Sequence, residues 1–176
     1  MKPARPGVSI GVRMLEANTA GAGASQADFF MRAALEAATR GMLAGEPPVG
    51  ACLVAGGEIV TTLGNGVIGE LDITAHAEMR VIREACRQLR KLDLSGCTLY
   101  VTVEPCVMCL TACHYAGIVE IIYGADIADM NAVTGNELGV SPDGKMPLKV
   151  EGGCLAAECR ALIATWSGGR RGSPVD

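Results

Sequence analysis

The sequence predicts an α/β layered fold, with helices on both faces of a sheet. The first observation is that strand-like apolar segments alternate with helical segments after an initial hairpin, the pattern of layered α/β proteins. The second is composition, with 49% apolar and 19% charged residues, as in ordinary globular proteins. The third is length, since 176 residues without a repeat or linker suit one domain with a real core.

The two ends of the chain differ in composition from its middle. Residues 1–24 are rich in Gly, Ala and Pro, and residues 167–176 in Gly, Ser and Arg, so we expect a flexible arm and a flexible tail around a folded domain over 25–166. Arg13 and Glu16 interrupt the apolar run that a secretory signal needs, and no segment is long enough to span a membrane. We therefore expect a cytoplasmic protein.

The first predicted helix follows Ser25. Ser25 is a good N-cap, and Asp28 is its partner in a capping box. We expect this helix to bury Phe29, Ala33 and Ala37. Two glycines and a Pro-Pro pair mark its end.

A hairpin and a second helix come next. The segments Val49–Ala55 and Glu58–Leu63 have strand character, and Gly56–Gly57 between them suits a two-residue turn. Thr74 is a candidate cap for a helix over Ala75–Leu89.

The second half continues the alternation. The segment Cys97–Val103 is an apolar strand, Pro105 suits the first position of a helix that ends at Gly117, and Val119–Tyr123 is another strand. The remaining expectations are a loop with a short helix over Asp126–Leu138, a strand over Leu148–Glu151 and a helix over Leu155–Trp166.

Three residues in two short motifs have the chemistry and spacing of metal ligands. They are His76 in His-Ala-Glu, and Cys106 and Cys109 in Pro-Cys-Val-Met-Cys. Cysteines at i and i+3 share a helix face, and a helix N-terminus favours the thiolates that zinc needs. Three protein ligands leave the fourth position of a tetrahedral zinc open, as in catalytic sites. Glu78 is two residues from His76, so it can stand beside the metal without ligating it.

A structural zinc is the alternative interpretation of this pattern. Cys113 or His114 could supply a fourth ligand on spacing alone. Otherwise Cys113 is a core residue, like most of the eight cysteines, and His114 a packed or exposed helix residue.

The motif H-x-E…P-C-x-x-C is characteristic of zinc-dependent base deaminases. With the segments 46–51, 74–78 and 98–109, the chain resembles the cytidine deaminase-like superfamily, in the branch of tRNA adenosine, guanine and cytosine deaminases. The resemblance implies a three-layer α/β/α sandwich around a mixed five-stranded sheet, a Zn2+ cofactor and a homodimer.

The resemblance also implies the chemistry of the site. Zinc-bound hydroxide would attack an aminated ring carbon, Glu78 would carry the proton, and ammonia would leave. Asn65 matches a substrate-contacting Asn of the branch, although an Asn between two glycines also suits a turn with positive φ. Ala77 lies where the family holds the base with backbone groups. Asp126 and Asp129 depart from the pattern of the tRNA enzymes and could accept hydrogen bonds from N–H groups of a heterocycle. The alternative is that Asp126 is a helix N-cap and Asp129 a solvated acid in the first turn of that helix.

Charge guides the expected substrate. The net charge is −4 and the pI about 5.2, whereas RNA-binding proteins are usually basic. We therefore expect a free nucleobase or nucleoside, guanine foremost and cytosine next, and a nucleic acid less so. The alternatives are adenosine-to-inosine editing of tRNA and an inactive nucleobase- or RNA-binding protein. Four arginines at helical spacing form either a solvated face or an RNA contact: Arg80, Arg83, Arg87 and Arg90.

Overall fold

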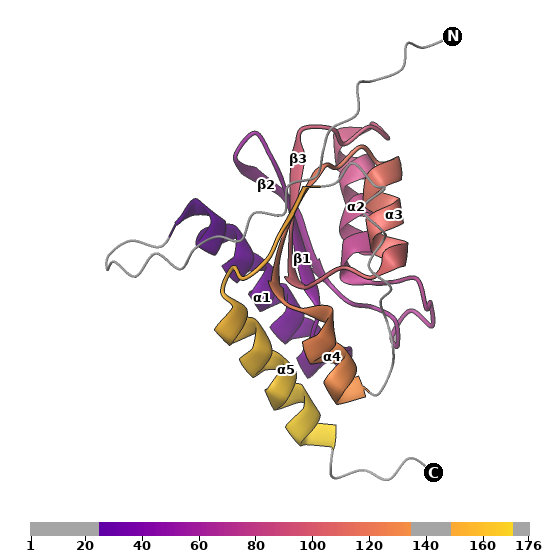
Figure 1. Ribbon diagram of the computed structural model, residues 1–176. Helices are drawn as coiled ribbons and strands as arrows, with labels where there is room; N and C mark the ends of the chain where they lie inside the picture. Colours follow the sequence, from indigo (N-terminus) through magenta and orange to yellow (C-terminus); the bar gives the residue numbers. More distant parts are fainter. Residues whose placement is uncertain (1–24, 135–148, 171–176) are drawn as a thin grey trace.

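Five strands form one mixed sheet in the computed structural model, which describes residues 25–134 and 149–170 (Figure 1). The strand order is β2-β1-β3-β4-β5. Antiparallel pairing joins β1 to β2 and β3, and parallel pairing joins β4 to β3 and β5. The strands are β1 (Gly50–Ala55), β2 (Glu58–Gly64), β3 (Cys97–Val103), β4 (Glu120–Ala125) and β5 (Lys149–Glu151).

Helices cover both faces of this sheet. Two of them, α2 (Ala77–Leu89) and α3 (Val107–Tyr115), lie side by side on one face (Figure 1). The other face carries α1 (Gln26–Leu43), α4 (Ile127–Thr134) and α5 (Ala156–Arg170). The expected three-layer sandwich with a mixed five-stranded sheet is confirmed.

The molecule has one hydrophobic core on each face of the sheet, because successive side chains of a strand point to opposite faces. In β1, Ala51 and Leu53 pack under α2 and α3, whereas Cys52 and Val54 pack under α1. Burial of both faces makes the strand apolar throughout, as in other sheets covered on both sides.

Glycines in β2 and β4 allow the helices α1 and α5 to approach the sheet closely. A Cβ at Gly64 would lie 2.7 Å from the carbonyl oxygen of Ala37 in α1, and a Cβ at Gly124 would overlap the Cys159 side chain of α5. These helices therefore pack against the backbone of β2 and β4.

The first helix begins as predicted, but it buries a different face. The side chain of Ser25 accepts from the N–H of Asp28 and the Asp28 carboxylate accepts from the N–H of Ser25, so the capping box is present. The prediction that Phe29 is buried is wrong, because its side chain is 60% exposed and Phe30 takes the core position. Ala37 is buried as expected, and Ala33 is half-buried.

Both helices that carry the metal motif begin later than predicted. Thr74 does not cap α2, since its hydroxyl donates to Asp72 in the preceding loop and His76 takes the N-cap position. Pro105 is not the first residue of α3, because Cys106 is the N-cap. Pro105 instead disfavours a helical conformation at the residue before it, where β3 has just ended.

The other bounds differ by a few residues. The strand β4 continues past Tyr123 to Ala125, because Ala125 still pairs with Val103 of β3. The expected short helix is α4, and α5 continues beyond the predicted end at Trp166. The expected arm over 1–24, the tail from 171 onward and residues 135–148 lie outside the described residues. None of the described helices has the length and apolar character needed to cross a membrane.

Candidate active site

The ends of two helices bring the predicted metal ligands together. His76 is the N-cap of α2 and Cys106 the N-cap of α3, and both have extended backbones. An N-cap side chain usually accepts a hydrogen bond from its own helix, but neither of these does so. Their side chains are therefore free to meet each other and Cys109, which lies in the first turn of α3.

The three ligand atoms have the spacing of a tetrahedral zinc site. Nδ1 of His76 lies 3.7 Å from Sγ of Cys106 and 3.6 Å from Sγ of Cys109, and the two sulfurs are 3.7 Å apart. Tetrahedral zinc with ordinary Zn–N and Zn–S bonds requires ligand atoms about 3.5–3.8 Å apart. The triad therefore fits zinc, with one coordination position left for water or substrate.

The same triad favours a thiolate. The hydrogen bond that Cys106 shares with Cys109, together with the one to His76, lowers the pKa of the Cys106 thiol to about 4. The contact with Cys106 in turn raises the pKa of His76. Negative charge at the sulfur is what a zinc ion binds.

Glu78 stands beside the triad without joining it. Its side chain is 3% exposed, and burial raises the pKa of its carboxyl group. The Oε2 atom has no hydrogen-bond partner among the described residues, although it is buried. A buried polar atom without a partner calls for a functional explanation.

Neither candidate for a fourth ligand joins the triad. Cys113 is a buried residue of α3 in the core on this side of the sheet, and burial raises the pKa of its thiol to about 12. His114 is exposed, with its ring 6.0 Å from that of Tyr115. Among the described residues, the metal-binding group consists of His76, Cys106 and Cys109.

A cavity of about 280 Å³ adjoins the triad and supplies room for a substrate. Asn65, Glu78 and Glu104 line it together with His76 and Cys106. The opposite wall comes from α4 and α5, through Ile127, Met130, Thr134 and Trp166. Sequence reasoning did not find these four residues, because three of them are apolar side chains with the pattern of ordinary core and Thr134 belongs to no motif.

Asn65 lines this cavity and also caps the helix that carries the ligand. Its Oδ1 accepts from the N–H of Ala77, the first residue of α2, at 2.8 Å. Its φ is not positive, so the turn interpretation based on positive φ is wrong. The N–H of Ala77 is thereby used within the protein, and Ala77 itself is fully buried and outside the cavity lining.

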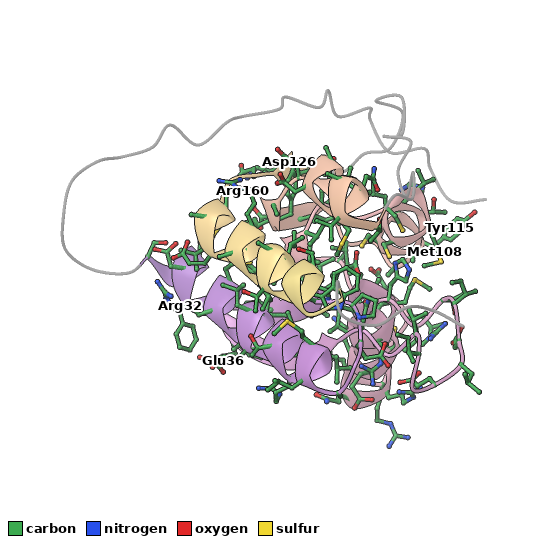
Figure 2. The ribbon with its side chains drawn as sticks, turned by 90° about the horizontal axis from the view of Figure 1, so that it is seen from below. Arg32, Glu36, Met108, Tyr115, Asp126 and Arg160 are labelled. Atoms are coloured by element: carbon green, nitrogen blue, oxygen red, sulfur yellow. The ribbon has the colours of Figure 1, made fainter. Side chains whose placement is uncertain are left out.

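The structure does not bring Asp126 and Asp129 to the cavity. Asp126 is exposed beside Arg160 at the outer surface (Figure 2). The carboxylate of Asp129 accepts from the N–H of Asp126 at 3.2 Å and lies 4.0 Å from Arg160. These are the contacts of residues at the start of a helix, which was the alternative interpretation.

The loop between β2 and α2, residues 65–76, is held from two sides. The buried carboxylate of Glu46 accepts from the N–H groups of Ile68 and Gly69, at 3.0 and 2.6 Å. Arg80 donates to the carbonyls of Gly64 and Asn65 and pairs with the carboxylate of Glu70.

Arg80, Arg83 and Arg87 of α2 have partners within the protein. Arg83 donates to the hydroxyl of Thr74 and lies 3.6 Å from the carboxylate of Asp72. Arg87 pairs with Glu84 on its own helix, and Arg90 ends the helix in a left-handed conformation. Arg80 and Arg83 therefore fix the loop beside the site, a role that the spacing of the arginines did not reveal.

Known families account for this combination of fold and site. Residues 24–125 match the cytidine and deoxycytidylate deaminase zinc-binding region. This match covers more than half of the chain and includes all three ligands and Glu78. The chain therefore belongs to this deaminase family and is a zinc-dependent hydrolytic deaminase.

Several individual proteins are similar to this chain in sequence or in structure. A tRNA-specific adenosine deaminase of Bacillus subtilis is 33% identical over 81% of this chain and 89% of its own length. One of Aquifex aeolicus is 47% identical over 56% of this chain, and the match spans only 65% of that relative. A solved structure from a study of A-to-I editing by tRNA:A34 deaminases has 34% identity and a TM-score of 0.67, over 76% of this chain and 98% of its own.

These likenesses correct the expected substrate. The prediction of a free nucleobase, guanine foremost, is wrong, because two curated relatives that match 81% and 80% of the chain are named tRNA-specific adenosine deaminases. The prediction relied on net charge and on Asp126 and Asp129. Net charge is a sum over the whole chain, and those two acids do not line the cavity.

Proposed function

We propose that the protein deaminates an adenosine within a tRNA and leaves inosine. The observation that carries the proposal is the likeness to tRNA-specific adenosine deaminases over most of this chain and most of theirs. The complete set of His76, Cys106, Cys109 and Glu78 supports an active enzyme over an idle binding protein.

The chemistry follows from the residues around the cavity. His76, Cys106 and Cys109 would hold zinc, which when bound lowers the pKa of water and so supplies the nucleophile. Glu78 accepts a proton from the attacking water and delivers it to N1 of the adenine ring. The proton lost on collapse goes to the amino group, which leaves C6 as ammonia. One water is consumed for each inosine formed.

Asn65 would orient the base in this scheme. Because its Oδ1 is held by the N–H of Ala77, the amide Nδ2 is the group left to donate to the substrate. A ring nitrogen of adenine is a suitable acceptor. Asn65 therefore has two roles in this proposal. Its Oδ1 caps the helix that follows His76, and its Nδ2 contacts the base.

A homodimer and a cytoplasmic location belong to the same proposal. Large apolar side chains are strongly exposed on the described surface, among them Leu71, Ile73 and Tyr115, at 93%, 77% and 84%. Exposed apolar side chains supply contact area for association where they lie together in one patch. A tRNA substrate would be met in the cytoplasm.

The deciding experiment is a substrate panel. Zinc-loaded protein is incubated with an adenosine-containing tRNA anticodon stem-loop and separately with free adenine, guanine, cytosine and their nucleosides. We expect inosine in the RNA and ammonia release, with Glu78→Ala inactive. Retention of the RNA should also weaken steeply with salt, because phosphate contacts release counterions. Turnover of a free base with none on the stem-loop would refute the proposal.

A further inference from the structure

We propose that Glu104 is a substrate-binding residue, whose free carboxylate oxygen accepts a hydrogen bond from a donor group of the bound nucleoside. This inference rests on the proposed function, since the donor groups considered are those of an adenosine. The place of Glu104 in the cavity lining and the hydrogen bond that its carboxylate already accepts support this role.

Glu104 sits at the junction of the metal centre and the opposite wall. It follows β3, precedes Pro105 and Cys106, and lines the same cavity as Glu78. Its backbone N–H donates to the carbonyl of Ala125 at 2.8 Å. The residue is thus fixed both by the sheet edge and by the turn into the metal-binding helix.

One carboxylate oxygen is occupied. Oε2 accepts from the N–H of Ile127, the first residue of α4, at 3.1 Å. This bond ties the start of α4 to the metal-bearing side of the cavity. It also fixes the direction of the side chain, which lowers the entropic cost of using its other oxygen for a ligand.

The other oxygen is available. Within residues 25–134 and 149–170, no hydrogen bond or ion pair engages Oε1 of Glu104. An ionised carboxylate only accepts hydrogen bonds, so a ligand in the cavity can satisfy this oxygen only with an N–H or O–H group. The site would therefore select for a donor at this place and against a bare acceptor.

An adenosine within RNA has few such donors. Its ring nitrogens are acceptors, which leaves the 6-amino group and the 2′-hydroxyl of the ribose. The amino group and the hydroxyl can each donate a hydrogen bond to a carboxylate. Removal of the 2′-oxygen from the substrate distinguishes between them.

The test compares Glu104→Gln with wild type on the stem-loop. The amide oxygen of Gln can keep the bond from Ile127, but its NH2 group then replaces the free acceptor with a donor. We expect kcat/KM to fall about 10- to 100-fold, the usual effect of losing a hydrogen bond to a charged group. Zinc content and melting temperature should stay at wild-type values. Glu58→Gln, which removes the same charge on the exposed hairpin, is the matched control and should leave kcat/KM unchanged.

A stem-loop with 2′-deoxyadenosine at the reactive position identifies the donor. If Glu104 binds the ribose, this substrate slows wild type as much as the mutation does and slows the variant no further. If Glu104 binds the amino group, the two losses multiply. Losses that do not add therefore place the bond at the 2′-hydroxyl, whereas losses that multiply exclude the 2′-hydroxyl and leave the 6-amino group as the donor.

Two results overturn it. One is a Glu104→Gln variant within threefold of wild type, and the other is a loss of activity that accompanies loss of zinc or of thermal stability, which would indicate a purely structural role. Wild-type protein that is inactive on the stem-loop would instead refute the proposed function and this inference with it.

Discussion

The ligands His76 and Cys106 occupy N-cap positions, where a side chain normally satisfies its own helix. At α2 that task passes to Asn65, which accepts from the first N–H of the helix. The imidazole of His76 is then free to face two sulfurs. The spacing of the motif predicted the three ligands, because zinc restricts the residue types and distances. It could not predict the role of Asn65, since that depends on a contact across twelve residues.

Glu78→Gln should separate proton transfer from metal binding. The amide fills the same buried space but cannot carry a proton, so we expect kcat to fall about 100- to 10,000-fold. Zinc content should stay the same, because Glu78 is not a ligand. The measurement is ammonia release alongside metal analysis of the purified variant.

Thermal unfolding provides the control for this variant. Burial raises the pKa of Glu78, which means that its charged form is unfavourable in the fold, so a neutral amide should not lower the melting temperature. If Glu78→Gln kept activity within tenfold of wild type, another group would have to carry the proton.

At the scale of elements, the cavity depends on a loop that has no regular structure of its own. Residues 65–76 contribute Asn65, Val67, Ile73 and His76 to the cavity lining. Hydrophobic periodicity predicts helices and strands but not such a loop, because its shape follows from contacts with Glu46 and Arg80. The wall from α4 and α5 was missed for a related reason. A side chain that faces a cavity and one that faces the core have the same pattern in sequence.

Glu46→Gln should weaken this loop. Both oxygens of the buried carboxylate accept backbone N–H groups, and Gln replaces one of those oxygens with an NH2 group that faces a donor. We expect a loss of about 1–3 kcal/mol in the free energy of unfolding. Urea unfolding measures it, and amide exchange at Ile68 and Gly69 should be faster.

Glu36→Gln is the matched control, because Glu36 is an exposed acid of α1. It removes the same charge without touching the loop, so its unfolding midpoint should equal that of wild type. Equal stability of Glu46→Gln and Glu36→Gln would show that the loop does not depend on the Glu46 carboxylate.

For the whole molecule, general patterns predicted the architecture better than the substrate. The alternation of strands and helices specified the layers, and the family resemblance specified the five-stranded sheet. Net charge pointed away from RNA, because it says nothing about where charges lie. Several are already paired within the fold, among them Arg80 with Glu70 and Lys149 with Glu120.

Removal of zinc should affect stability as well as activity, since the three ligands come from two helices with separate starts. An ion that binds only the folded state stabilises it by about 4 kcal/mol when present at a thousand times its Kd. In a chain of this length that corresponds to roughly 8–16 °C in melting temperature.

Treatment with a strong chelator should therefore abolish turnover and lower the melting temperature, and added zinc should restore both. Magnesium should restore neither, because thiolates are poor ligands for it. Cys106→Ser, which lacks one ligand, should start from the lower melting temperature and respond little to the chelator. A chelated protein that kept its full activity would show that the triad holds no catalytic metal.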